Sequence, residues 1–159
     1  LRDLGAAMSP FNAFTFLQGL ETLPLRIERH CENTQKVANF LSTHNKVSKT
    51  IYPSLMNDKP LERAKKYLNN SFGSLLGFEL KNGEEAGRKF IDNLKLLFHV
   101  ANIGDARSLA IHPSSTTHSQ LSEKEKLAAG VTPGYIRVSV GIEHIDDIIA
   151  DIEQALEKT

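Results

Sequence analysis

The sequence is poor in cysteine, and it carries no excess of charge of either sign. Cys31 is the single cysteine among 159 residues, which excludes an internal disulfide and a cysteine-ligated metal cluster. Nineteen basic and nineteen acidic residues give a formal net charge of zero. That balance gives no electrostatic argument for a nucleic acid or a membrane surface as a partner. A lone free cysteine fits the reducing cytoplasm, where we expect the protein to act.

Long apolar runs and a conventional start are missing as well. No apolar stretch approaches the roughly 20 residues that a membrane-spanning helix needs. The chain begins "LRDLGAAMSPF", without an initiator methionine and without the pattern of a signal peptide. We therefore expect a piece of a longer protein, with about the length of one domain.

Helical patterns dominate the first part of the chain. Ser9 followed by Pro10 is typical of a helix start, and Pro24 is expected to kink or break the helix that follows. Beyond Pro24, small and apolar side chains recur at spacings of three and four residues. This period predicts one buried helical stripe in which the cysteine is a core residue: Ile27, Cys31, Thr34, Ala38 and Leu41.

Extended and helical segments then alternate along the rest of the chain. Strands are expected at 46–53, 72–80, 96–102, 108–113 and 135–140, and helices at 61–68, 83–94, 121–130 and 145–156. This order, without repeats or a low-complexity linker, predicts a single α+β sandwich. We expect a mainly antiparallel sheet of about four strands, with helices over one face.

One arginine lies inside an otherwise apolar strand, in the stretch "YIRVSV". The two-residue period of a strand separates two faces, with Ile136, Val138 and Val140 on one and Tyr135, Arg137 and Ser139 on the other. If helices cover the aliphatic face, Arg137 points away from the core. It is then either a solvated arginine on an open sheet face or a group that binds a carboxylate through its planar, bidentate fork.

Other candidate motifs indicate little. His112 and His118 flank "PSSTT", but without a nearby carboxylate or cysteine they are a weak signal for a metal site. No G-x-S-x-G elbow supports a hydrolase, and no glycine-rich loop has the lysine and hydroxyl of a phosphate site. The residues by themselves thus predict an α+β domain with an arginine and a polar loop that can bind an anion.

Three stretches together go further: "GAAMSPFNAFTFLQGLETLPLRIERH", "ANIGDARSLAIHPSSTTHSQL" and "GVTPGYIRVSVGIEHIDDIIADIEQAL". In this order, and over nearly the whole chain, they resemble the carboxy-terminal third of the Cys/Met-metabolism enzymes that use pyridoxal phosphate. Within that family, "GDARSLAIHPSSTTHSQLS" most resembles the sulfhydrylases of O-acetylhomoserine. The cystathionine synthases and lyases usually carry a Ser-Leu-Gly-Gly run where this chain has residues 102–105.

The resemblance implies a fold and three site residues. The fold would be the carboxy-terminal small domain of the aspartate-aminotransferase-like, fold type I enzymes, with 1–45 as an interdomain helical segment broken near Pro24 and 46–159 as the α+β domain. The family's R-hydrophobic-S-hydrophobic-G-x-E pattern would make Arg137 the ligand of the substrate α-carboxylate. Asn102 replaces the family's serine partner and can still donate a hydrogen bond. Thr117, before a histidine, would also line the site.

The resemblance also implies a reaction and its missing parts. The family enzyme would replace the acetate of O-acetylhomoserine by sulfide or a thiol, a step of methionine biosynthesis, with pyridoxal phosphate as electron sink. The Schiff-base lysine and other cofactor ligands would lie upstream. This chain would therefore hold no catalytic, cofactor or metal-binding residue, and it would be inactive alone. The expected partners are an amino-acid substrate, the absent amino-terminal domain and further copies in a homo-oligomer. The alternatives are a cystathionine synthase or lyase of the same family, or a free-standing, non-enzymatic domain that binds a small carboxylate.

Overall fold

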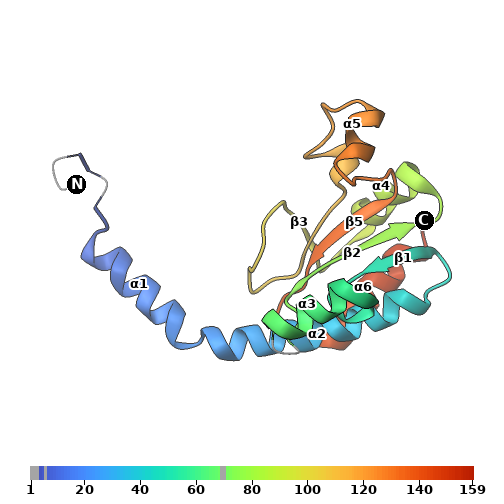
Figure 1. Cartoon of the computed structure of the whole chain (residues 1–159). Coiled ribbons are helices and arrows are strands. Elements are labelled where there is room, and N and C mark those ends of the chain that lie inside the picture. Colours follow the sequence, from blue (N-terminus) through green and yellow to red (C-terminus); the bar gives the residue numbers. More distant parts are fainter. Residues whose placement is uncertain (1–3, 6, 69–70) are drawn as a thin grey trace.

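Five strands form one mixed sheet in the computed structural model, which describes residues 4–5, 7–68 and 71–159. The strand order is β1–β2–β5–β4–β3, with bounds Val47–Ile51, Leu75–Leu80, Tyr135–Ser139, Leu109–Ile111 and Phe98–His99 respectively. Neighbouring strands are antiparallel except for β3 and β4, which pair in parallel. The prediction of about four mainly antiparallel strands is thus close, and the segment 96–102 contributes only the two-residue strand β3 (Figure 1).

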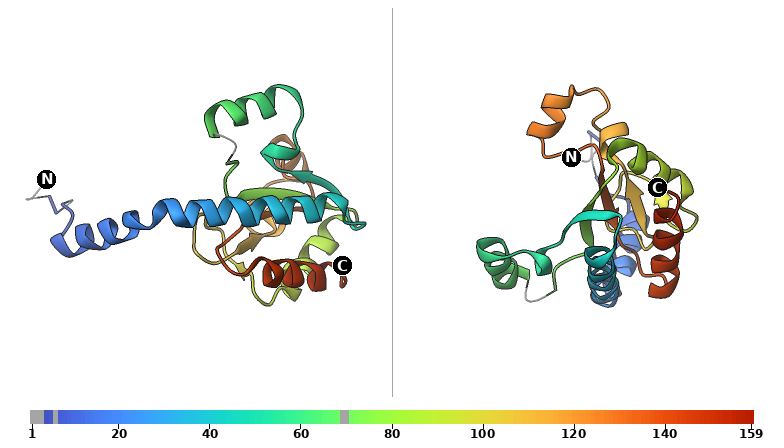
Figure 2. Two further views of the ribbon diagram at one scale, coloured as in Figure 1. Left: turned by 90° about the horizontal axis from the view of Figure 1, so that it is seen from below. Right: turned by 90° about the vertical axis from the view of Figure 1, so that its right-hand side faces the viewer.

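Three helices pack on one face of this sheet and on one another: α2 (Leu23–Thr43), α4 (Gly83–Asn93) and α6 (Ile145–Leu156). The core between the two layers contains side chains that are fully shielded from solvent, including Val37, Phe78, Phe90, Ile136, Ile148 and Ile152. The shorter helix α3 (Asp58–Leu68) lies in the connection from β1 to β2, and α5 (Glu123–Ala128) lies in the connection from β4 to β5. Figure 2 shows α3 standing apart from the three core helices.

The first long helix is broken, as predicted near Pro24. Helix α1 (Pro10–Glu21) ends one residue before Thr22, and Pro24 lies in the first turn of α2, where a missing backbone N–H breaks no helical hydrogen bond. The predicted buried stripe begins one turn later than expected. Cys31, Thr34, Ala38 and Leu41 are buried, but the side chain of Ile27 is 45% exposed. Figure 2 shows the end of α2 next to α1 extending beyond the sheet.

The second half of α2 belongs to the same core as the sheet. Val37, Ala38 and Leu41 pack into it, whereas no residue of α1 is buried. The division of the chain into an interdomain segment, 1–45, and a domain, 46–159, stays a prediction. None of the helices in the described part of the chain is long and apolar enough to cross a membrane.

Helix α1 forms an arm that projects away from the sheet (Figure 1). Its large apolar side chains are exposed, among them Phe11 (77%), Phe14 (58%), Phe16 (62%), Leu17 (60%) and Leu20 (57%). Several large apolar side chains exposed on one helix indicate a site of association.

We expect the 159-residue chain to self-associate through this arm at high concentration. Burial of one large apolar side chain contributes about 1.5–3 kcal/mol, so a few such residues can hold two copies together. Sedimentation velocity over a range of concentrations would show dimers or larger species. The double variant Phe11→Ser with Phe14→Ser should shift the distribution toward monomer, and a monodisperse wild-type monomer at high concentration would contradict the expectation.

Candidate carboxylate-binding site

Strand β5 separates its side chains as the two-residue period predicts. Ile136, Val138 and Val140 are completely buried beneath the helices, whereas Tyr135 and Arg137 are partly exposed on the opposite face. Arg137 lies in the centre of the sheet, opposite a residue of β2 on one side and of β4 on the other. The sheet therefore presents one guanidinium group on the face that the helices leave open.

Arg137 contacts Asn102, one of the residues that the family resemblance implies for the same site. Its Nη2 donates a hydrogen bond to the backbone oxygen of Asn102 at 3.4 Å. The side-chain oxygen of Asn102 accepts a hydrogen bond from the N–H of Ile103 at 2.9 Å. No carboxylate in the described residues forms a salt bridge with Arg137. One long hydrogen bond to a neutral carbonyl leaves most of the five guanidinium donors for a ligand.

Tyr135 shapes the space beside the arginine, a feature that the sequence reasoning missed. Its ring lies over Gly77, the residue of β2 that pairs with Arg137, and any side chain at Gly77 would collide with the phenol ring. Burial raises the pKa of Tyr135 above its usual value, while Arg137 opposes the shift and Glu79 adds to it. The phenol therefore occupies the β2 side of the arginine. Alternation placed Tyr135 on this face, but its contact with Gly77 depends on the strand register.

The structure leaves Thr117 outside the contact between Arg137 and Asn102. Thr117 is exposed and follows the short 3-10 helix Pro113–Ser115; its Oγ1 makes a hydrogen bond of 2.8 Å with Nδ1 of His118. Within the described ranges, no hydrogen bond joins Thr117 to Arg137 or Asn102. Its place in the site therefore stays a prediction.

His112 is a structural residue. It is buried, with Nε2 2.7 Å from the carbonyl oxygen of Pro133 and Nδ1 2.8 Å from Oγ of Ser115. Because a carbonyl can only accept, Nε2 carries the proton and Nδ1 accepts from the serine. Burial lowers the pKa of His112, which favours the neutral form of the ring. The described residues contain no group of three or more His, Cys, Asp or Glu side chains that could hold a metal ion.

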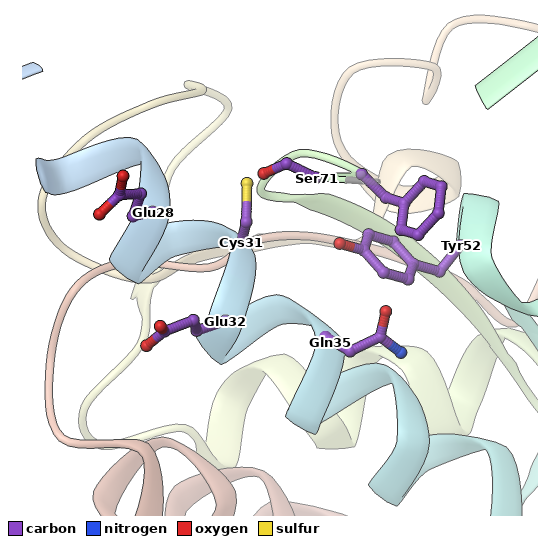
Figure 3. A pocket seen from close by; sticks show the side chains of 7 residues that line it. Glu28, Cys31, Glu32, Gln35, Tyr52 and Ser71 are labelled. Carbon is purple, nitrogen blue, oxygen red and sulfur yellow. The ribbon is translucent and has the colours of Figure 1, made fainter. Parts of the chain in front are cut away.

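A separate hollow of about 350 Å³ lies between α2 and the end of β1. Figure 3 shows the side chains that line it, with Cys31 on α2 across from Tyr52. The hydroxyl of Tyr52 donates to the carbonyl oxygen of Gly73 at 2.9 Å, and burial raises the pKa of Tyr52, with Cys31 adding to the shift. Cys31 is 9% exposed, in agreement with its predicted core position. Arg137 is not part of this hollow.

The fold and the arginine define a class of protein: an α+β domain with a partly exposed guanidinium group on the sheet face that the helices leave open. The family described as Cys/Met metabolism PLP-dependent enzyme matches residues 1–157, and the chain belongs to this family.

Relatives with a named activity match almost the whole chain. It is 58% identical over 158 residues to the O-acetyl-L-homoserine sulfhydrylase of Leptospira meyeri, a match that covers 99% of this chain and 36% of the relative. It is 52% identical to the homocysteine synthase of Schizosaccharomyces pombe over 157 residues, 99% of this chain and 37% of the relative. The chain thus spans little more than a third of the curated relatives it matches.

A solved structure gives the same answer for the fold. The crystal structure of a putative O-acetylhomoserine (thiol)-lyase from Campylobacter jejuni matches with a TM-score of 0.88 and 50% identity, over 98% of this chain and 37% of that one. That structure contains N'-pyridoxyl-lysine-5'-monophosphate at position 205 of the lyase. The likeness confirms the predicted fold, the carboxy-terminal small domain of fold type I enzymes.

Proposed function

We propose that this chain is the carboxy-terminal, substrate-carboxylate-binding part of a pyridoxal-phosphate-dependent O-acetylhomoserine sulfhydrylase. Such an enzyme exchanges the acetate of O-acetylhomoserine for sulfide or a thiol, giving homocysteine or methionine. The observation that carries the proposal is the 58% identity to a sulfhydrylase of that name over 158 residues. We further propose that the complete enzyme is a cytoplasmic homo-oligomer, in keeping with the single free cysteine.

In this proposal Arg137 binds the α-carboxylate of the amino-acid substrate. Its guanidinium faces the open side of the sheet, and its one neutral acceptor, the carbonyl oxygen of Asn102, is 3.4 Å away. A carboxylate would offer two charged acceptors, and each charge-assisted hydrogen bond contributes about 1.5–3 kcal/mol when water is excluded. The side-chain N–H groups of Asn102 would supply a further donor, and Thr117 would line the same space.

The cofactor would be held upstream of this chain. When bound, pyridoxal phosphate supplies the electron sink for the exchange. The residues present here bind and orient the substrate carboxylate. In the isolated chain the site is open to solvent, which reduces the contribution of an exposed ion pair to about 0–1 kcal/mol. We therefore propose that the chain alone neither binds amino acids measurably nor turns them over.

Restoring the upstream part tests this proposal. The polypeptide that continues upstream of Leu1, or a chimera with the upstream part of the Leptospira meyeri relative, should form homocysteine from O-acetylhomoserine and sulfide. The 159-residue chain should form none, with or without added pyridoxal phosphate. An assay with cystathionine is the control for the related lyases. Activity on cystathionine alone would replace the proposal by the lyase alternative, and a gene that starts near Leu1 would favour a free-standing carboxylate-binding domain.

A further inference from the structure

The loop that contacts Arg137 is not held in place by the packing of buried side chains. It runs from residue 100 to 107, and every residue in it is exposed. At its base the Arg107 guanidinium stacks over the Phe98 ring, 4.7 Å from the ring centre. An exposed loop of this length keeps one position only where hydrogen bonds hold it. The position of Asn102 relative to Arg137 therefore depends on a few specific bonds.

These bonds tie the second half of the loop to the end of β5. The N–H of Gly104 donates to Oγ of Ser139 at 3.2 Å, and the N–H of Ile142 donates to the carbonyl oxygen of Ala106 at 2.9 Å. Ser139 lies two residues after Arg137 on the same face of the strand. The loop is thus attached to the strand that carries the arginine.

Glu143 makes the strongest of these attachments. One carboxylate oxygen accepts from the N–H of Ser108 at 2.6 Å, and the other accepts from the Ser108 hydroxyl at 2.9 Å. The hydroxyl oxygen in turn accepts from the N–H of Gly141 at 2.8 Å. Ser108 is fully buried, and the charge of Glu143 has no basic partner in the described part of the chain. Both oxygens of the Glu143 carboxylate therefore bind Ser108.

The other side of Glu143 is anchored to α2. The side-chain amide of Asn33 donates to the backbone oxygens of Gly141 and Glu143, at 3.0 and 2.9 Å. A side chain at Gly141 would collide with the Glu143 carboxylate, the Ala106 oxygen and the Ser108 nitrogen. The Glu143 carboxylate thus links the turn at residues 141–143, which Asn33 holds to α2, to the end of the loop at Ser108.

We infer that Glu143 is a positioning residue of the carboxylate site: through Ser108 it fixes the loop that carries Asn102, and so the place of Asn102 beside Arg137. The inference rests on the proposed role of Arg137 as ligand of the substrate carboxylate. A glutamine at 143 would keep the shape but carry no charge, and its NH₂ group could meet the Ser108 hydroxyl only as a donor, not as the present acceptor. The loop would then lose a charge-assisted attachment and move away from the arginine.

Glu143→Gln in the full-length enzyme should raise KM for the amino-acid substrate about tenfold, the equivalent of one hydrogen bond, with kcat changed much less. In the 159-residue chain the same substitution should speed amide hydrogen exchange at Ser108. Glu62→Gln, on the exposed side of α3, is the matched control and should change neither. A lower melting temperature with an unchanged KM would show a merely structural role and overturn the inference.

A double variant separates this inference from the proposed function. If Glu143 acts through Asn102 and Arg137, its substitution should raise KM far less in an Arg137→Lys background than in wild type. Fully additive effects would overturn the inference. An Arg137→Lys variant with unchanged KM would instead contradict the proposed function.

Ser108→Ala is the second variant, in case Glu143→Gln fails to fold. It keeps the hydrogen bond from the backbone N–H of residue 108 to Glu143 and should still raise KM, by about threefold on the same hydrogen-bond scale. An unchanged KM in this variant would also overturn the inference.

Discussion

Replacing Arg137 by lysine in the full-length enzyme is expected to lower kcat/KM for O-acetylhomoserine by roughly 10- to 100-fold, mainly through KM. An ammonium group is a point charge on a flexible stem, and it cannot make the two parallel hydrogen bonds of a guanidinium to a carboxylate. One charge-assisted hydrogen bond of about 1.5–3 kcal/mol is then lost. Steady-state kinetics over a range of substrate concentrations would measure the change.

Arg88→Lys is the matched control for this prediction. Arg88 lies on the exposed side of α4, and its Nη2 pairs with Glu84 at 2.7 Å, a contact that lysine can replace at little cost because the pair is solvated. Its kcat/KM should equal that of wild type. An Arg137→Lys enzyme with wild-type kcat/KM would show that Arg137 is a solvated surface arginine.

The second large effect concerns stability. Asp151→Asn is expected to lower the free energy of unfolding of the chain by about 2–4 kcal/mol. Asp151 is buried, and its carboxylate accepts from three successive backbone N–H groups, those of Lys95, Leu96 and Leu97, at 2.8 to 3.0 Å. An asparagine presents its own N–H groups to some of these donors, which leaves buried donors without an acceptor.

Asp147→Asn gives the matched control on the same helix. Asp147 lies in the exposed first turn of α6, where its charge interacts mainly with the helix dipole and contributes about 0.3–1 kcal/mol. Urea unfolding of both variants, followed by circular dichroism, would give the two differences. If Asp151→Asn cost no more than Asp147→Asn, the three hydrogen bonds would not contribute to stability as proposed.

The local pattern predicted most of the secondary structure, because helix and strand periods are properties of neighbouring residues. The alternation in β5 placed Arg137 on the face opposite Ile136 and Val138, and burial follows this alternation up to Val138, whereas Ser139 on the arginine's face is also buried. The proline at 24 marked the break between α1 and α2 to within two residues. In each case the signal lies in a few consecutive positions.

Contacts between distant segments could not be predicted from such local patterns. Ile27 keeps the helical spacing of its stripe but is exposed, since whether a helix turn is covered depends on how far the sheet extends. Strand β3 was expected within 96–102 but is only two residues long, and its parallel pairing with β4 depends on how the intervening loop folds back.

The sequence by itself determined the order of the elements, the apolar faces, and the arginine that the open sheet face presents. Tertiary structure decided what surrounds that arginine. Glu143 and Ser108 are 35 residues apart, Asp151 and Lys95 are 56 apart, and Tyr135 meets Gly77 only through the register of two strands. The face of a helix or strand on which a side chain lies is fixed by the neighbouring residues in the chain. Its hydrogen-bond partner is fixed by the strand order, which brings distant residues together.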